Sequence, residues 1–261
     1  MDRVGFDQKR FDIIAKEVTD YLGRIGLVPK VIIPISARDG DMIAAQSPRL
    51  SWYKSQTLVE AIDAFLPKSV SAQLPLRLPI QDVYKFDQRR ILVGRVESGT
   101  LRVGDKVLFS PSNKTAEVRT IESFGDQILP HEAKTGQSVG FTLSDQIFVE
   151  RGELASHEIS PPVLSNIFRV TFFWLASAPL APGQRLKLKL TTRESIVTVQ
   201  SIDKVIDTET LALSAGSEVP RNAVAEVTLR SQHVIALDEY RHNAVTGRFT
   251  LVDGYDTVAG G

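Results

Sequence analysis

The sequence contains no cysteine among its 261 residues, which excludes disulfides, thiolate metal sites and thiol catalysis. It has no apolar run near the roughly 18 to 20 residues that a membrane span requires, and its N-terminus lacks the apolar core of a signal peptide. Neither sign of charge is in excess, because Lys plus Arg and Asp plus Glu each number 31. A neutral chain has no long-range attraction to nucleic acid or anionic lipid. We therefore expect a cytoplasmic protein without a membrane or nucleic-acid partner.

Motifs for chemistry are also missing. No Gly-x-x-x-x-Gly-Lys-Ser/Thr stretch occurs, although a phosphate cradle needs such a loop and a hydroxyl for Mg²⁺. The four histidines are not at metal-ligand spacing, and no serine stands near a His/Asp arrangement. These four are His131, His157, His233 and His242. The sequence therefore predicts neither a catalytic residue nor a metal site, and the turn at His242-Asn243 is interpreted as structural.

Residues 1–70 are predicted to alternate helix and strand. Asp7 is a candidate N-cap for a helix whose apolar positions run from Phe11 to Ile25 at helical spacing. Val31–Ile35 is continuously apolar, as expected of a strand buried on both faces of a parallel sheet. Thr57 and Glu60 have capping-box spacing and open a second helix. Two helices and one strand cannot cover a sheet, so this segment is expected to be part of a larger α/β domain.

From residue 71 onward the pattern changes to short strands and turns, which predicts a mainly β chain. Residues 71–160 carry turn signals every eight to twelve residues, as a small closed antiparallel barrel does. Residues 161–261 form a second all-β unit, in which Leu186, Leu188 and Leu190 alternate with two lysines. That alternation indicates a barrel strand with one solvent-exposed face. Alternation also places Phe172 and Trp174 on one face of their strand and Phe173 on the other.

Several stretches resemble one family. Arg90–Phe109 is similar to the second domain of elongation-factor-Tu-like GTPases, and Met1-Asp2 with Ser36-Ala37 resembles the last two guanine-binding segments of that superfamily. Gly40–Ala44 with Trp52-Tyr53, and above all the tail Leu237–Phe249, resemble the GTPase subunit of bacterial heterodimeric sulfate adenylyltransferase. The resemblance implies the C-terminal part of a P-loop GTPase domain followed by two barrels of the translation-factor domain II and III type, N-terminally truncated.

The resemblance also implies what the family does. Its GTPase subunit hydrolyses GTP with Mg²⁺ and drives a catalytic adenylyltransferase subunit, which makes adenosine 5′-phosphosulfate from ATP and sulfate. Asp2 would accept hydrogen bonds from guanine N1–H and its amine, and the Ser36-Ala37 turn would face the guanine carbonyl. Because the phosphate loop, the switch segments and half of the Asn-Lys-x-Asp motif are missing, we expect no hydrolysis and no tight nucleotide binding by this chain. In some members of the family the subunit is fused to an adenylylsulfate kinase, and we expect no such domain within these 261 residues.

Alternatives stay open. Asp2 is also interpretable as a frayed terminal carboxylate, and Ser36-Ala37 as an ordinary strand-to-loop turn. The chain could be a tRNA- or protein-binding barrel pair from a translation GTPase, or a pseudo-GTPase scaffold. Arg90, Arg95 and Arg102 indicate a basic face on the first barrel for solvation or a partner. Exposed apolar faces in the first segment predict a homo-oligomer.

Overall fold

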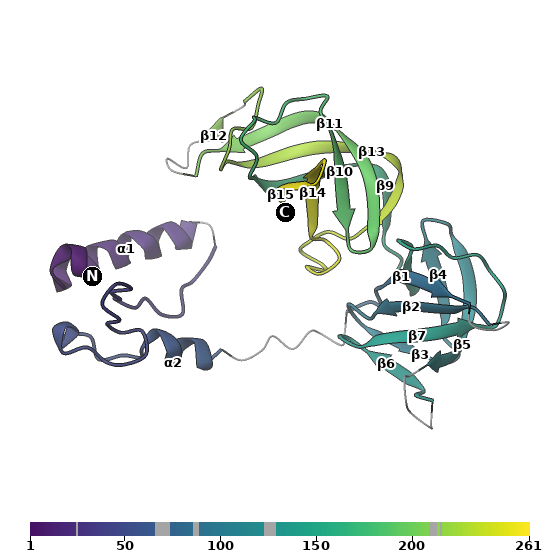
Figure 1. Ribbon diagram of the computed structural model, residues 1–261, viewed down its shortest axis with the longest axis horizontal. Coiled ribbons are helices and arrows are strands. Elements are labelled where there is room, and N and C mark those ends of the chain that lie inside the picture. Colours follow the sequence, from purple (N-terminus) through teal and green to yellow (C-terminus); the bar gives the residue numbers. More distant parts are fainter. Residues whose placement is uncertain (25, 66–73, 86–88, 123–128, 209–212, 215) are drawn as a thin grey trace. The chain divides into compact units, whose positions relative to one another are not determined.

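The computed structural model describes residues 1–24, 26–65, 74–85, 89–122, 129–208, 213, 214 and 216–261 (Figure 1). The chain divides into two compact units, Met1–Lys68 and Ser69–Gly261. The first unit contains the helices and the second contains the strands. The mainly β fold class with two antiparallel barrels is therefore confirmed. No helix in the described part of the chain is long and apolar enough to cross a membrane.

Among its described residues, the first unit has four helical elements. They are η1 (Asp2–Val4), α1 (Gln8–Arg24), η2 (Pro48–Leu50) and α2 (Leu58–Asp63). Asp7 caps α1 as predicted, because its carboxylate accepts from the amides of Lys9 (3.2 Å) and Arg10 (3.3 Å). The capping box before α2 is also confirmed: Thr57 and Glu60 each bind the other's main-chain N–H.

The apolar face predicted for α1 is only partly used. Phe11 packs on Trp52 with ring centroids 5.3 Å apart and edge-on against Tyr53 at 6.2 Å. Ile14 and Val18 remain 42% exposed on the same helix. Ile25, which the pattern also placed on this face, lies outside the described residues. The helix is therefore anchored by aromatic contacts at its first turn, whereas Ile14 and Val18 face solvent and Ala15 and Leu22 are half-buried.

The prediction of a strand at Val31–Ile35 was wrong. These residues form no strand; Pro34 is buried and the other four are half-buried. A strand needs a neighbouring strand to complete its main-chain hydrogen bonds. No described segment pairs with these five residues as a neighbouring strand. Pairing begins only at Ser36, which forms an isolated bridge with Asp41. The second helix is also shorter than its apolar pattern, because it ends at Asp63 and leaves Phe65 outside.

The first barrel is built from six strands in the order β1-β2-β7-β5-β4-β8, and β3 and β6 form a two-stranded ribbon beside it. Their bounds are β1 (Leu78–Tyr84), β2 (Ile91–Arg95), β3 (Thr100–Arg102), β4 (Lys106–Ser110), β5 (Lys114–Glu122), β6 (Glu132–Lys134), β7 (Ser138–Leu143) and β8 (Leu154–His157). Fully buried Phe109 and Phe141 fill the centre. Gly99 has φ +72°, and a Cβ there would lie 2.7 Å from the Leu76 main chain, so this turn requires glycine.

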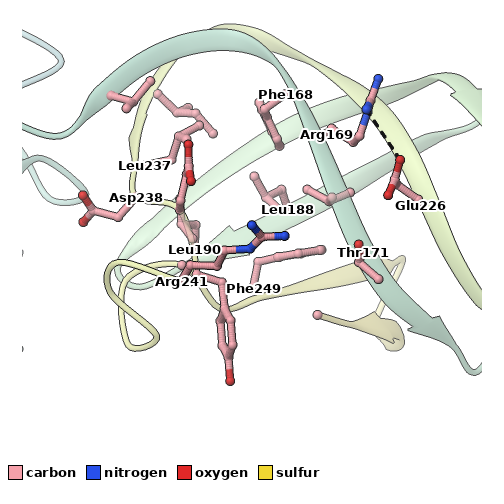
Figure 2. Close-up of a pocket in the computed structure, with 17 residues that line it drawn as sticks. Phe168, Arg169, Thr171, Leu188, Leu190, Glu226, Leu237, Asp238, Arg241 and Phe249 are labelled. Carbon is pink, nitrogen blue, oxygen red and sulfur yellow. Dashed lines mark ion pairs between the residues drawn. The ribbon is translucent and has the colours of Figure 1, made fainter. Parts of the chain in front are cut away.

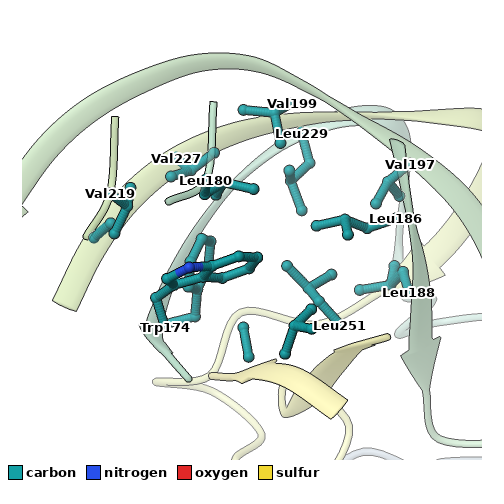
Figure 3. Packing of buried hydrophobic residues seen from close by; sticks show 14 of the residues in the cluster. Trp174, Leu180, Leu186, Leu188, Val197, Val199, Val219, Val227, Leu229 and Leu251 are labelled. Atoms are coloured by element: carbon teal, nitrogen blue, oxygen red, sulfur yellow. The ribbon is translucent and has the colours of Figure 1, made fainter. Parts of the chain in front are cut away.

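The second barrel follows the order β10-β14-β15-β9-β13-β11, and a β10–β11 pairing closes it. Its strands are β9 (Val163–Trp174), β10 (Arg185–Leu190), β11 (Arg193–Ile206), β13 (Val224–Leu237), β14 (Phe249–Asp253) and β15 (Asp256–Gly260), with short β12 (Leu213–Ser214) beside β11. Trp174 lies in the core among aliphatic side chains from several strands (Figure 3). Leu186, Leu188 and Leu190 point inward and are at most 7% exposed. The predicted alternation is therefore confirmed.

A buried polar cluster joins the two barrels. The Arg77 guanidinium, just before β1, forms two parallel hydrogen bonds to the Asp238 carboxylate, just after β13, at 2.7 and 2.8 Å. The two side chains are 6% and 9% exposed. Arg77 also donates to the Ser160 carbonyl (2.8 Å), and Thr246 Oγ1 donates to Asp238 (2.6 Å). We call Arg77, Asp238 and Thr246 the inter-barrel clamp.

Candidate nucleotide-base site

The first unit brings the two predicted base-binding segments together. Ser36 Oγ donates a hydrogen bond to Asp2 Oδ1 at 3.0 Å, although the residues are 34 positions apart. The Met1 ammonium donates to the Ile35 carbonyl at 2.6 Å and holds the two segments side by side. Ser36 is fully buried, whereas the Asp2 side chain keeps 22% of its surface exposed. A buried hydroxyl therefore positions a carboxylate that is still open to solvent.

The charge of that carboxylate is set by its neighbours. The hydrogen bond from Ser36 is the largest cause that lowers the pKa of Asp2 below its ordinary value. The chain's terminal ammonium and Arg38 act in the same direction. Asp2 is therefore ionised at neutral pH and presents only acceptors. A carboxylate in this state suits a ligand edge with two adjacent N–H donors.

A tight loop follows Ser36. The Gly40 amide donates to the Ser36 carbonyl at 2.8 Å, and Gly40 adopts φ +82°, in the left-handed region that glycine occupies without strain. The Ser36 hydroxyl also accepts from the Asp39 amide at 3.4 Å. Ala37, the other predicted site residue, is exposed in this turn. The exposed turn after Ser36 therefore lies beside the Asp2 carboxylate.

Arg49 holds this loop in place. Its guanidinium pairs with Asp41 and donates to Asp39 at 3.1 Å, and Ser47 Oγ donates to Asp41 at 2.6 Å. The guanidinium carbon lies 4.4 Å from the centroid of the Phe6 ring, close enough for a cation–π contact. Arg49 therefore ties the loop after Ser36 to the segment that follows Asp2. The sequence prediction missed Arg49, because no spacing rule connects a loop arginine with aspartates eight and ten residues earlier.

Other predicted residues lie elsewhere. His242 is exposed in a turn where its amide donates to the Glu239 carbonyl at 2.9 Å. The neighbouring Asn243 is buried and its Oδ1 accepts from the amides of Val245 and Thr246, so the predicted turn is present. Asn243 also donates to Ser98 Oγ at 2.9 Å. Ser98 therefore takes part in the contact between the two barrels.

Three arginines of the first barrel do not form one free basic surface. The Arg90 guanidinium stacks on Phe148 at 4.1 Å, and Arg102 lies 3.4 Å from a Glu132 oxygen. Arg95 is exposed on β2. Within the described ranges, no group of three His, Asp or Glu side chains forms a cluster that could hold a metal ion.

Comparison with known proteins first identifies the class of the two barrels. The family model of elongation factor Tu domain 2 matches residues 89–146, and that of the GTP-eEF1A C-terminal domain-like family matches residues 167–261. A solved structure of sup35 complexed with GDP has the same fold, with a TM-score of 0.68 and 22% identity. The matched region covers 98% of this chain and 64% of the sup35 chain. The barrels are of the translation-factor type.

Relatives in sequence match nearly the whole chain. Sulfate adenylyltransferase subunit 1 of Shewanella oneidensis is 33% identical over 259 residues, which are 97% of this chain and 53% of that protein. The subunit of the same name from Teredinibacter turnerae is 30% identical over 262 residues, which are 100% of this chain and 56% of that protein. The chain spans about half the length of these relatives. The chain is similar to sulfate adenylyltransferase subunit 1 along essentially its whole length, which confirms the predicted resemblance.

Proposed function

We propose that this chain contributes the base-recognising end of a guanine-nucleotide site and two partner-binding barrels to a sulfate adenylyltransferase. The single observation that carries the proposal is the Ser36–Asp2 hydrogen bond, which joins two distant segments around one ionised carboxylate. Guanine offers the carboxylate two neighbouring donors, N1–H and the exocyclic amine. Adenine offers no such pair. The carbonyl of the base would then face the turn at Ala37.

The barrels supply the rest of the proposed role. Family relationship supports a GTP-hydrolysing, energy-coupling subunit whose partner is the catalytic adenylyltransferase subunit. The inter-barrel clamp is a buried ion pair that links the two barrels, and such a link would suit transmission of a nucleotide-dependent movement to a partner. Capture of the purified catalytic subunit by immobilised chain, without capture of aminoacyl-tRNA, is the expected result. The reverse result would favour a translation factor.

This polypeptide alone is proposed not to hydrolyse GTP and not to hold GTP and Mg²⁺ tightly, since residues 1–261 include no Gly-x-x-x-x-Gly-Lys-Ser/Thr. Phosphates and metal supply most of the charged contacts to a nucleotide. A phosphate-release assay on the purified chain should give background rates. Self-association is supported by exposed apolar side chains in the first unit, such as Val28 at 90% and Ile13 at 50% exposure, and light scattering tests it.

Base selectivity tests the site directly. NMR titration of the chain should show that guanosine shifts the resonances of Asp2 and Ser36 more than inosine does, because inosine lacks the exocyclic amine. The Asp2→Asn variant should lose this preference and favour xanthosine, whose C2 carbonyl can accept from the new amide. Asp12→Asn removes an exposed carboxylate on α1 and is the matched control. Equal shifts with guanosine and inosine would contradict the proposed site.

A further inference from the structure

A pocket of about 440 Å³ opens on the first barrel, and basic side chains outnumber acidic ones in its lining. A larger groove of about 790 Å³ on the second barrel differs, because its acidic side chains are at least as many as its arginines, and Arg169 lies 3.6 Å from Glu226 there (Figure 2). We call the pocket on the first barrel the arginine pocket. Its charged lining residues are Arg89, Arg90, Arg119 and Asp145.

Two neighbouring side chains of β5 line the arginine pocket, although side chains of a regular strand alternate between its faces. Val118 and Ile121 are both fully buried in the barrel core, and they are three positions apart. The pairing of β5 with β7 shifts between Val118 and Thr120, as it does at a β-bulge. Arg119 and Thr120 therefore both lie on the outer face of β5, and both line the pocket. The bulge thus turns an arginine toward this pocket.

The arginines of the pocket differ in what they contact. Arg119 is exposed and forms no ion pair within the described ranges. The guanidinium carbon of Arg90 lies 4.1 Å from the centroid of the Phe148 ring, and a guanidinium that stacks on a ring can still donate from its in-plane N–H groups. Arg89 is already 3.8 Å from a Glu122 oxygen. Arg119 and Arg90 therefore supply the charged donors that a ligand can use.

The rest of the lining favours a ligand with an organic part. Thr120 Oγ1 donates to Glu122 at 2.7 Å and lies 2.6 Å from Thr142 Oγ1, so both hydroxyl protons are already engaged. Recognition of negative charge is therefore left to the guanidiniums. Small organic ligands occupy pockets of about 300–1,000 Å³ with mostly apolar linings, and the arginine pocket is in that range. Its apolar lining residues are Leu92, Leu143 and Ile147.

We propose that the arginine pocket binds the phosphate group of a small organic phosphate monoester. Guanidiniums bind phosphate through pairs of parallel N–H···O hydrogen bonds, and Arg90 and Arg119 are placed to donate them. A phosphate monoester carries about −1.5 to −2 charge near neutral pH, which suits the excess of positive charge in the lining. The carbon part of the ester contacts Leu143 and Ile147. A nucleic-acid phosphodiester carries a single charge and matches this lining less well.

The test titrates the complete chain with phenyl phosphate and follows the main-chain amides by NMR. Binding should saturate and should shift the amide resonances of Thr120, Leu143 and Ser144. Methyl phenyl phosphate, which has one charge, and inorganic phosphate, which has no carbon part, should each bind at least about fivefold more weakly. Equal binding of the diester would indicate a site for nucleic-acid backbone, and equal binding of inorganic phosphate would remove the organic part. Either result would overturn the proposal.

A matched pair of variants locates the site on the protein. Arg119→Gln removes a charge that has no ion pair within the described ranges, and affinity for phenyl phosphate should fall at least about tenfold. Arg95→Gln removes an exposed arginine of β2 that does not line the pocket, and affinity should stay within about twofold. Circular dichroism verifies that both variants fold, and the ligand series decides the question if one does not. Equal affinities of the two variants would refute the assigned site.

Discussion

The inter-barrel clamp gives the sharpest prediction about stability. Arg77→Met removes a guanidinium that makes two hydrogen bonds to Asp238 and two more to the Leu76 and Ser160 carbonyls. The change leaves the Asp238 carboxylate, 9% exposed, without its countercharge. Breaking a buried ion pair by removing one partner costs about 3–5 kcal/mol. The unit Ser69–Gly261 should lose stability by that amount.

Urea unfolding followed by circular dichroism measures the effect. With an m-value of about 2 kcal/mol/M, a loss of about 3–5 kcal/mol lowers the midpoint by about 1.5–2.5 M. Arg95→Met, at an exposed arginine of β2, is the control and should change stability by no more than about 0.5 kcal/mol.

A double variant separates the energy of the ion pair itself from the energy of the other contacts that each side chain makes. Arg77→Met combined with Asp238→Leu replaces both charges with apolar groups, which is often nearly neutral. We expect it to lose less stability than Arg77→Met alone, so the coupling energy should be at least as large as the loss that Asp238→Leu causes alone. Single-variant losses as small as that of Arg95→Met would refute the reasoning. So would additive losses in the double variant.

Three further predictions follow. Ser36→Ala removes the main hydrogen bond that lowers the pKa of Asp2, so NMR titration should show that pKa rise toward its ordinary value. Burial raises the pKa of Glu153, so the folded state holds its proton more tightly than the unfolded chain. Glu153→Gln should therefore raise the Tm at pH 7, and the gain should vanish below the ordinary glutamate pKa, where both states are protonated. Thr57→Ala removes the cap that binds the Glu60 amide and should cost the first unit about 1 kcal/mol in urea unfolding, whereas no loss would show that the cap is dispensable.

Local patterns predicted much of the fold. The two-residue period in Leu186–Leu190 and in Phe172–Trp174 identified strand faces correctly, since Phe172 and Trp174 are buried and Phe173 is 36% exposed. Cap residues at Asp7 and Thr57 located helix starts, because capping depends on residues only two or three positions away. Such signals are contained in the sequence near the element that they specify.

Features that depend on distant partners were not predictable in the same way. An apolar run at Val31–Ile35 is compatible with a strand, but it becomes one only beside a neighbour. Arg77 and Asp238 are 161 residues apart, and no local pattern marks them as a pair. The candidate site shows both cases: resemblance predicted Asp2 and Ser36 as site residues, and the structure joins them by a hydrogen bond. The contacts of Arg49 became visible only in the folded loop.

The strand order of the second barrel has a consequence for synthesis on the ribosome. β9 is made first, yet both of its neighbours, β13 and β15, come late in the chain. During translation β9 must remain without either flanking strand until residue 224 has emerged. Sheets assembled from sequence-distant strands fold slowly and expose pairing edges meanwhile. Nascent chains halted before β13 should therefore be the species most prone to aggregate and to engage chaperones.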